Sequence, residues 1–331
     1  MRKFTAIVYA RTMEFLRDKG TFYWNLIFPI VLVVGFSFAF SGNNDAIFKI
    51  GIIGEDPGKS NSFLELSSIE IINYESGREE VIEKIRRHQI DMLIDFDERT
   101  YYLNNEASAS ELLRILGAVE LVDFTEHEVT GEPIRYVDWL VPGVIGMNML
   151  FSCMFGVGFV IVRYRKNGVL KRMKATPVSP FVFISGQMVS RFLIVLVTSI
   201  VVFTGTNIFL HFVVNGSYLL LILITMLAIL CMISFGLIFA ARLKSEELAS
   251  GLMNLITFPM IIFSGVFFSL EGTPKLMQIA SRFFPLTHFI EASRAVMIDG
   301  AGIIQIMPNL LILSGMTIIF LLTASFFFRW E

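Results

Sequence analysis

The chain contains six long runs of apolar residues with almost no charge, and this feature most restricts what it can fold into. The hydrocarbon core of a bilayer is about 30 Å thick, and roughly 20 apolar helical residues cross it. One such run is also consistent with a long buried helix of a soluble protein, but six in a chain of 331 residues predict a polytopic α-helical membrane protein. The expected transmembrane helices are 21–41, 139–162, 181–212, 218–241, 248–270 and 306–328.

Charged residues are divided unevenly along the chain. Residues 41–138 hold 9 of the 27 basic and 21 of the 29 acidic residues, which gives this stretch a net charge of −12. The rest holds 18 basic and 8 acidic residues, a net charge of +10, so the overall value of −2 conceals the division. A hydrophobic fraction of 54% excludes an intrinsically disordered chain. We therefore expect a soluble domain, 42–138, inserted between the first and second transmembrane helices.

Alternating short strands and amphipathic helices predict a small α/β fold for this domain. The expected strands are 48–53, 69–73, 91–96 and 100–103, and the expected helices are 78–87 and 107–121.

The segment 51–60, GIIGEDPGKS, follows the first expected strand and has some features of a phosphate-binding loop. The spacing of that motif requires glycine where this chain has Ile53, and Pro57 lacks a backbone N–H. We interpret the segment as a turn, and we expect no nucleotide site, catalytic residue or cofactor in this chain. The four histidines have no metal-ligand spacing, so no metal site is expected either.

Basic residues gather in alternate connections between the apolar runs. Loops rich in Lys and Arg stay in the cytoplasm. Residues 1–20 carry five basic residues, and loop 163–180 carries six without any acid. This pattern predicts a multi-pass membrane protein with both termini cytoplasmic and residues 42–138 outside. We expect it in a prokaryotic plasma membrane.

The first 20 residues are expected to form an amphipathic helix on the inner leaflet, with a frayed cytoplasmic tail as the alternative. Phe4, Val8 and Phe15 share one face of such a helix, and Arg11 falls inside that face. We expect Arg11 to snorkel to the headgroups. A second arginine, Arg191, lies about 16 Å into the third expected helix if that helix starts at residue 181. It either snorkels, belongs to a helix that starts later, or lies on a polar transport path.

Loop 163–180 contains a segment with the signals of a short helix. Gly168 can end the helix before it, and Pro177 ends the segment because the residue before proline is pushed out of the helical region. Val169, Leu170 and Met173 would form an apolar ridge with basic residues around it. Two interpretations remain open: a contact site for a cytoplasmic partner, or a basic loop on lipid headgroups.

The run 168–179, GVLKRMKATPVS, resembles the cytoplasmic loop of ABC-2-type transporter permeases, especially the drug- and lipid-exporter branch with a large extracytoplasmic domain. Residues 15–30, FLRDKGTFYWNLIFPI, resemble the family's entry to its first span, and 283–300, FFPLTHFIEASRAVMIDG, resemble its outward segment before the last span. The order of one span, an outer α/β domain and five more spans agrees with that branch. Lys171 departs from the pattern, because many members carry an acid there.

The resemblance implies an exporter subunit that moves an amphipathic or lipid-like substrate. Its partners would be a cytoplasmic ABC ATPase that binds ATP and Mg, a second permease subunit (identical or a close paralogue) and membrane lipids, with no nucleic acid. The helix that contacts the ATPase would comprise Gly168, Val169, Leu170, Lys171, Arg172, Met173, Lys174, Ala175, Thr176 and Pro177. The chain itself would not be an enzyme.

A mechanotransmitting or sensory protein, which relays ATPase motion to the outer domain without cargo, is the alternative. An ion-coupled carrier is disfavoured, because the expected helices contain no acidic residue in their interiors.

The outer segment 271–305 is expected to form two short re-entrant helices, bounded by Pro274 and Pro285 next to Phe284. His288 and Arg294 either anchor it at the interface or contact an exiting substrate. Pro29, Pro259 and 156–158 are positions where the long helices are expected to be less rigid.

Overall fold

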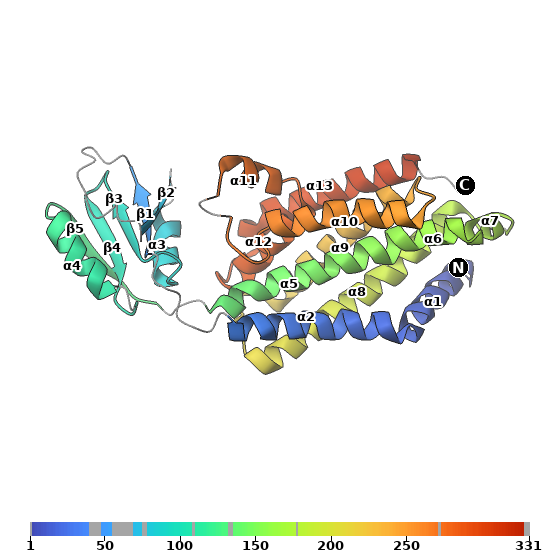
Figure 1. Ribbon diagram of the computed structural model, residues 1–331, viewed down its shortest axis with the longest axis horizontal. Helices are drawn as coiled ribbons and strands as arrows, with labels where there is room; N and C mark the ends of the chain where they lie inside the picture. The colour runs from blue at the N-terminus through green and yellow to red at the C-terminus, as the bar shows by residue number, and fades with distance from the viewer. Residues whose placement is uncertain are drawn as a thin grey trace. The chain divides into compact units, whose positions relative to one another are not determined.

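The computed structural model describes residues 2–39, 48–54, 69–74, 78–107, 110–131, 135–176, 178–270 and 273–327 (Figure 1). The chain divides into two compact units. The helical unit contains Met1–Phe38, Val137–Leu270 and Pro274–Glu331. The sheet unit contains Ala39–Tyr136 and Glu271–Thr273. Of the turn predicted over 51–60, residues 51–53 belong to a strand, and 55–60 lie outside the described residues, as does the helix-ending Pro177.

Six helices of the described residues are long and apolar enough to cross a membrane, in agreement with the six predicted spans. They are α2 (Lys19–Ala39), the continuous helix α5–η2–α6 (Tyr136–Cys153, Met154–Phe159, Val160–Lys166), α8 (Pro180–Leu210), α9 (Tyr218–Ala240), α10 (Glu246–Phe263) and α13 (Ile303–Phe327). Shorter helices are α1 (Arg2–Arg17), α7 (Val169–Lys174), α11 (Lys275–Ser281) and α12 (Pro285–Met297).

The fifth span, α10, differs most from its predicted range of 248–270. It begins earlier because Ser245 caps it, accepting a hydrogen bond from the Leu248 N–H at 3.2 Å. It ends earlier because Gly265 adopts a left-handed conformation with φ of 70°, just after the last turn. Residues 264–270 are therefore not helical, and their carbonyl groups are available to side chains from elsewhere.

Helix α9 lies at the centre of the helical unit and packs against α8, α12, α13 and the segment η2. Small residues make the closest of these contacts possible. A Cβ added to Gly158 of η2 would lie 2.7 Å from the carbonyl oxygen of Gly236 in α9, so the two backbones touch where neither residue has a side chain.

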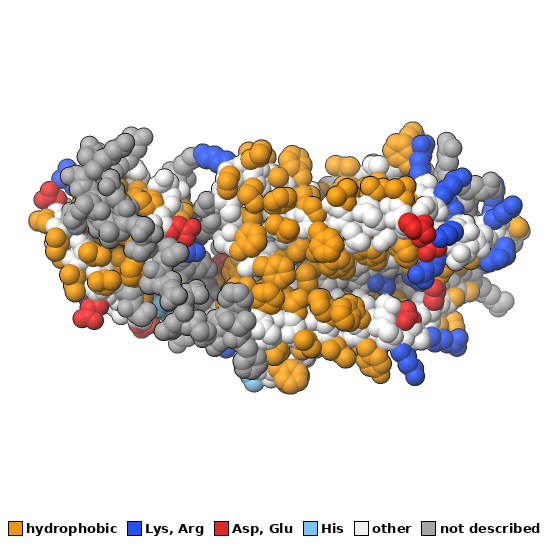
Figure 2. Space-filling model, viewed as in Figure 1, with side chains coloured by type: hydrophobic (Ala, Val, Ile, Leu, Met, Phe, Trp, Pro, Cys, Tyr) orange, Lys and Arg blue, Asp and Glu red, His pale blue; other side chains and the backbone are white. Residues whose placement is uncertain are grey.

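Side-chain type varies along the helical unit. Figure 2 shows hydrophobic side chains over the length of its helices and Lys and Arg gathered at the end that holds α6 and α7. Both of the predicted short helices before the last span are present as α11 and α12, but α12 is packed against α9, α10 and α13. Most of the α12 side chains are buried, so this helix belongs to the core of the unit.

The sheet unit is a mixed five-stranded sheet in the order β2-β1-β3-β4-β5. Its strands are β1 (Phe48–Ile53), β2 (Ile69–Tyr74), β3 (Met92–Asp95), β4 (Thr100–Asn104) and β5 (Thr125–Val129), and only β3 and β4 pair antiparallel. Alternate side chains form two cores, one under α3 (Arg78–Arg86) and one under α4 (Ser110–Glu120). The small α/β fold predicted for this stretch is thus observed as helix, sheet and helix layers.

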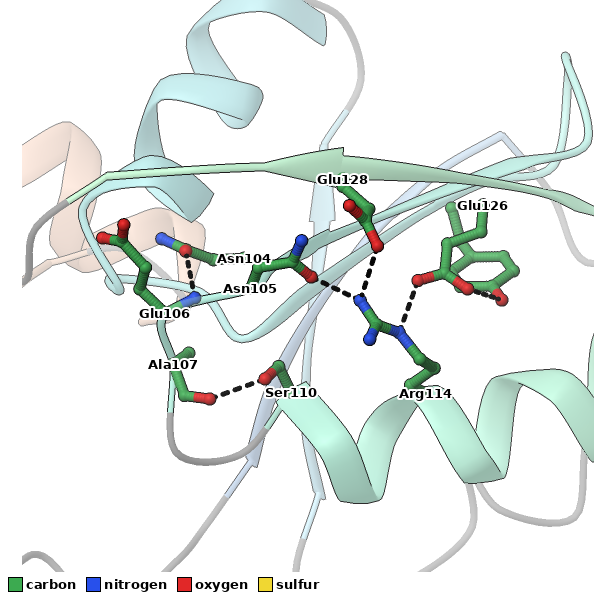
Figure 3. A network of polar contacts seen from close by, with 9 residues as sticks. Asn104, Asn105, Glu106, Ala107, Ser110, Arg114, Glu126 and Glu128 are labelled. Atoms are coloured by element: carbon green, nitrogen blue, oxygen red, sulfur yellow. Dashed lines mark hydrogen bonds and ion pairs between the residues drawn. The ribbon is translucent and has the colours of Figure 1, made fainter.

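Strand β5 was not predicted, because its sequence, TEHEV, is polar at four of five positions. It is held by a network of polar contacts shown in Figure 3. Arg114 of α4 donates to Glu126 Oε1 at 2.6 Å and to Glu128 Oε1 at 3.0 Å. Tyr101 of β4 donates to Glu126 Oε2 at 3.0 Å, and burial together with this carboxylate raises the pKa of Tyr101 to about 12.

Among the described residues of the sheet unit, one carboxylate is buried: Asp95, at the end of β3. Arg78 at the start of α3 pairs with it. Arg78 Nε donates to Asp95 Oδ2 at 2.9 Å, while the backbone N–H groups of Asp97 and Glu98 donate to Oδ1. The side chain of Asp95 is wholly buried, whereas that of Arg78 is 33% exposed.

Arg78→Met is expected to weaken the sheet unit by about 2 kcal/mol, because it leaves a buried carboxylate without its cation, and partial exposure of Arg78 moderates the loss. Hydrogen exchange at β1 and β3 of the full chain measures this value. Arg86→Met is the matched control, since Arg86 pairs with Glu83 at the surface, and it should cost less than about 0.5 kcal/mol. Equal losses in both variants would contradict the role given to Arg78.

Candidate functional site

The second candidate span contains a six-residue π-helical segment, η2, that replaces the regular helix at Met154–Phe159. Such segments interrupt the regular pattern of backbone hydrogen bonds and occur frequently at functional sites. Gly156 lies within η2, and a Cβ added there would be 2.0 Å from Cζ and Nε of Arg191. The guanidinium group therefore occupies the space where Gly156 has no side chain. Residues 156–158, where the sequence predicts a less rigid helix, lie within this segment.

Arg191 is buried, with 5% of its surface exposed, eleven residues after the start of α8 at Pro180. Its Nε donates to the carbonyl oxygen of Ser152 at 2.7 Å, and Nη2 donates to Ser152 Oγ at 2.6 Å. Cζ lies 5.4 Å from the ring centre of Phe15. Both snorkelling and a later helix start are therefore wrong for Arg191. Polar acceptors from the α5–η2 helix, which sequence periodicity does not reveal, hold this side chain inside.

Helix α1 is bound to the same place through Arg11. Arg11 is 8% exposed, and its Nη2 donates to the carbonyl oxygen of Gly156 at 2.8 Å. The prediction that Arg11 snorkels is wrong, because the irregular backbone of η2 offers this carbonyl to it. Ile7 packs against Gly186 of α8, so at this position α1 contacts a neighbouring helix.

Glu14 and Tyr164 complete the contacts of Arg11. Arg11 Nη1 forms an ion pair with Glu14 Oε2 at 2.8 Å, and the Tyr164 hydroxyl donates to the same carboxylate. Burial alone would raise the pKa of Glu14, but Tyr164 and Arg11 outweigh it and lower the pKa below its usual value. The charge of Arg11 is thus balanced by a carboxylate.

Arg191 and Arg11 line a cavity of about 600 Å³ in the helical unit, which we call the arginine pocket. Aromatic rings form much of its wall, and asparagine amides and a few charged groups interrupt them. The aromatic lining residues are Phe15, Trp24, Phe28, Phe151, Phe155 and Phe159. The polar lining residues include Arg11, Glu14, Asp18, Asn25, Asn148, Arg163, Arg191 and Asn254.

Helix α7 forms where a short helix was predicted, directly after Gly168, whose φ of 68° is left-handed. Its orientation differs from the expectation. Leu170 is wholly buried and Met173 is half-buried, so the apolar ridge packs onto the helical unit and is not presented to a partner. The exposed face consists of Lys171, Arg172 and Lys174.

The basic end of α6, next to α7, is bound to the start of α10. Lys166 Nζ lies 3.2 Å from Glu247 Oε1 and 3.7 Å from Glu246 Oε1. Arg165 donates to the carbonyl oxygen of Leu243. Since α6 continues into η2, these contacts bind the start of α10 to the helix that forms part of the wall of the arginine pocket.

His288 and Arg294 both make polar contacts within the helical unit. His288 is 3% exposed, and its ring nitrogens lie 2.9 Å from Asn309 Oδ1 and 2.8 Å from the carbonyl oxygen of Arg282. Arg294 is half-buried, donates to the carbonyl oxygens of Trp139 at 3.0 Å and Gly265 at 2.8 Å, and stacks over the Trp139 ring. Arg294 takes this position because residues after the end of α10, such as Gly265, have carbonyl groups available to it. Phe284 and Pro285 lie at the start of α12.

Gly156→Ala is expected to lower the apparent melting temperature of the full chain in detergent by about 5 °C or more, because the added methyl group and the Arg191 guanidinium cannot share one space. The control is Gly315→Ala in α13, where an added Cβ meets no atom within 4 Å, and it should leave the melting temperature unchanged or higher. A melting temperature equal to that of the unmodified chain for Gly156→Ala would contradict this packing.

Comparison with known proteins links most of the chain to one family. The family described as ABC-2 family transporter protein matches residues 19–326, which confirms the resemblance found in the sequence. The inner membrane transport permease YhhJ of Escherichia coli (strain K12) is 26% identical over 186 residues, 55% of this chain and 49% of YhhJ. The linearmycin resistance permease protein LnrN of Bacillus subtilis (strain 168) is 26% identical over 164 residues, 49% of this chain and 42% of LnrN.

A longer match is ABC transporter G family member 20 of Dictyostelium discoideum, 22% identical over 343 residues, 90% of this chain and 46% of that protein. The chain spans about half the length of the curated relatives it matches.

Proposed function

Because the chain belongs to the ABC-2 family of transporter proteins, we propose that it is the membrane-spanning permease subunit of an ATP-binding-cassette exporter. It moves an amphipathic or lipid-like substrate out of the cell, using ATP that a separate cytoplasmic subunit binds with Mg and hydrolyses. A second permease subunit, identical or closely related, completes the transporter. Relatives named for linearmycin resistance and, as probable, for multidrug transport support outward movement.

The observation that carries this proposal is the connection from α7 to the arginine pocket. Lys171, Arg172 and Lys174 form an exposed basic face on a helix whose apolar side is fastened to the helical unit. A push on α7 is transmitted through α6 to η2, where Gly156 contacts Arg191 and Arg11. Motion of the ATPase thereby changes the walls of the pocket.

The gathering of basic side chains near α6 and α7 supports a cytoplasmic location for this end of the helical unit and for both termini. With an odd number of crossings before it, the stretch 42–138 is then outside. Transport itself needs no reactive group in this chain, because the coupled hydrolysis occurs on the ATPase.

Replacing Lys171, Arg172 and Lys174 together by Glu is expected to reduce capture of a co-expressed partner ABC ATPase by about tenfold or more. Reversed charges repel at a contact that basic side chains supply. Because all three side chains are exposed, the melting temperature should change little. Co-purification in mild detergent, quantified against the unmodified chain, gives the result.

The matched control is Lys275→Glu, an exposed lysine at the start of α11, in the segment expected outside. It should leave capture unchanged. Undiminished capture by the α7 variant would show that the ATPase binds elsewhere.

A second candidate function is mechanotransmission to the outer domain without cargo. The division of the chain into two compact units favours this candidate, because one unit could respond to the other. The sheet unit has hydrophobic cores of its own. Deleting 46–136 from an exporter should preserve substrate-stimulated ATPase activity in reconstituted vesicles, because the arginine pocket lies wholly in the helical unit. Complete loss of substrate-stimulated ATPase activity, while the chain still captures the ATPase, would instead support the mechanotransmitter.

A further inference from the structure

We propose that the arginine pocket binds an anionic amphiphile, with the acidic headgroup held by Arg191 and the apolar part against the surrounding aromatic rings. This inference names the substrate class of the exporter proposed above and rests on that function. It depends on three properties of the pocket: an unbalanced buried cation, an aromatic wall and sufficient volume.

The positive charge of Arg191 has no carboxylate partner among the described residues. Its hydrogen bonds go to the backbone oxygen and hydroxyl of Ser152, which are neutral groups. No described group accepts a hydrogen bond from its third nitrogen, Nη1. A cation buried within a membrane-spanning helix is costly, and its presence marks a site where a counter-charge is supplied. An anionic ligand would supply both the counter-charge of Arg191 and an acceptor for Nη1, since guanidinium groups bind phosphate and carboxylate with strong charge-assisted hydrogen bonds.

The two carboxylates of the pocket are already engaged, so they do not neutralise Arg191. Glu14 accepts from Arg11 and Tyr164. Asp18 accepts from the Thr21 hydroxyl at 2.6 Å and from the Thr21 N–H at 3.2 Å, and these bonds lower its pKa. Arg163 is half exposed and lies 4.0 Å from Glu246 Oε2, and Asp18 is exposed. Arg191 is therefore the one buried charge of the pocket lining without an oppositely charged partner among the described residues. This balance favours an anionic over a cationic amphiphile.

Aromatic rings supply the apolar surface for the rest of the ligand. Trp24 and Phe28 stack with ring centres 4.8 Å apart on α2, and Phe151 and Phe155 stack at 6.1 Å on the opposite helix. A volume of about 600 Å³ lies within the range of small-molecule sites. Both pairs of rings line the same cavity as Arg191, so charge and apolar surface are available to one amphipathic molecule.

The test measures binding of dodecyl phosphate to the purified full chain in neutral maltoside micelles, without any ATPase. Arg191→Gln is expected to weaken binding about tenfold or more, because a charge-assisted contact is lost. Arg242→Gln, which removes an exposed arginine that does not line the pocket, is the matched control and should bind like the unmodified chain. The unmodified chain should bind dodecylphosphocholine and dodecyltrimethylammonium about tenfold more weakly, and inorganic phosphate not measurably.

A second pair of variants tests the pocket without altering Arg191. Asn254→Trp fills the cavity from α10 and should abolish binding, whereas Leu255→Trp, at a neighbouring side chain that is 67% exposed, should not. The proposal is overturned if Arg191→Gln and Asn254→Trp both bind dodecyl phosphate normally, or if the cationic probe binds more tightly than the anionic one.

Competition in lipid nanodiscs identifies the source of the anion. If phosphatidylglycerol, added to phosphatidylcholine discs, displaces dodecyl phosphate, the ligand is a membrane phospholipid. If it does not, the ligand is a separate lipophilic acid, and either result supports an anionic amphiphile. If the unmodified chain captures the ATPase but does not bind dodecyl phosphate, only this inference is refuted. If the unmodified chain binds dodecyl phosphate but captures no ABC ATPase, only the exporter is refuted.

Discussion

The contact between Arg191 and the bare backbone at Gly156 is the interaction on which the arrangement of α1, α5 and α8 depends. A guanidinium group inside an apolar helical unit needs oxygen acceptors, and a regular helix uses its carbonyls for its own hydrogen bonds. The π-helical segment η2 breaks that pattern. The backbone oxygens of Ser152 and Gly156 then accept from Arg191 and Arg11, which come from two different helices. One local irregularity thus joins three elements.

The same irregularity connects the parts of the proposed transport cycle. Helix α7 is linked through α6 to η2, helix α1 is bound to η2 by Arg11, and the wall of the arginine pocket includes η2. In a rigid helix a push at one end would displace the whole span. In the proposed cycle we expect a segment with altered hydrogen bonding to allow rotation about Gly156, and Arg191, which contacts Gly156, to move with it.

Features set by local sequence could be predicted, and those set by long-range contacts could not. Six spans follow from runs of apolar residues, and the position of α7 follows from Gly168 with its freedom to adopt a left-handed φ. The orientation of α7 depends on where Leu170 is placed by α6, which no periodicity shows. Strand β5 is polar and depends on Arg114 in α4. The end of α10 depends on Gly265, a residue that many membrane helices tolerate.

Arginine positions were predicted least well, for a common reason. Arg11, Arg191 and Arg294 were each considered as groups that reach toward headgroups, yet all three donate to backbone carbonyls inside the helical unit. These carbonyls become available at η2 and near helix ends, where backbone groups lack regular partners. Sequence patterns locate apolar faces, but they do not show which carbonyl oxygens a helix leaves unused.

The hydrogen-bond acceptors of Arg191 are neutral oxygens, so its positive charge remains available to a ligand in the arginine pocket. A carboxylate partner would cancel the charge of Arg191 and remove the attraction for an anion, whereas carbonyl and hydroxyl oxygens orient the guanidinium group and leave its charge in place. The bonds to Ser152 also persist when no ligand is present, so departure of an anion does not strand an unsolvated guanidinium group. Because the partners of Arg191 are neutral oxygens, the site can bind an anion selectively and can also release it. An exporter requires that combination, because a substrate held as tightly as in a buried ion pair would not leave.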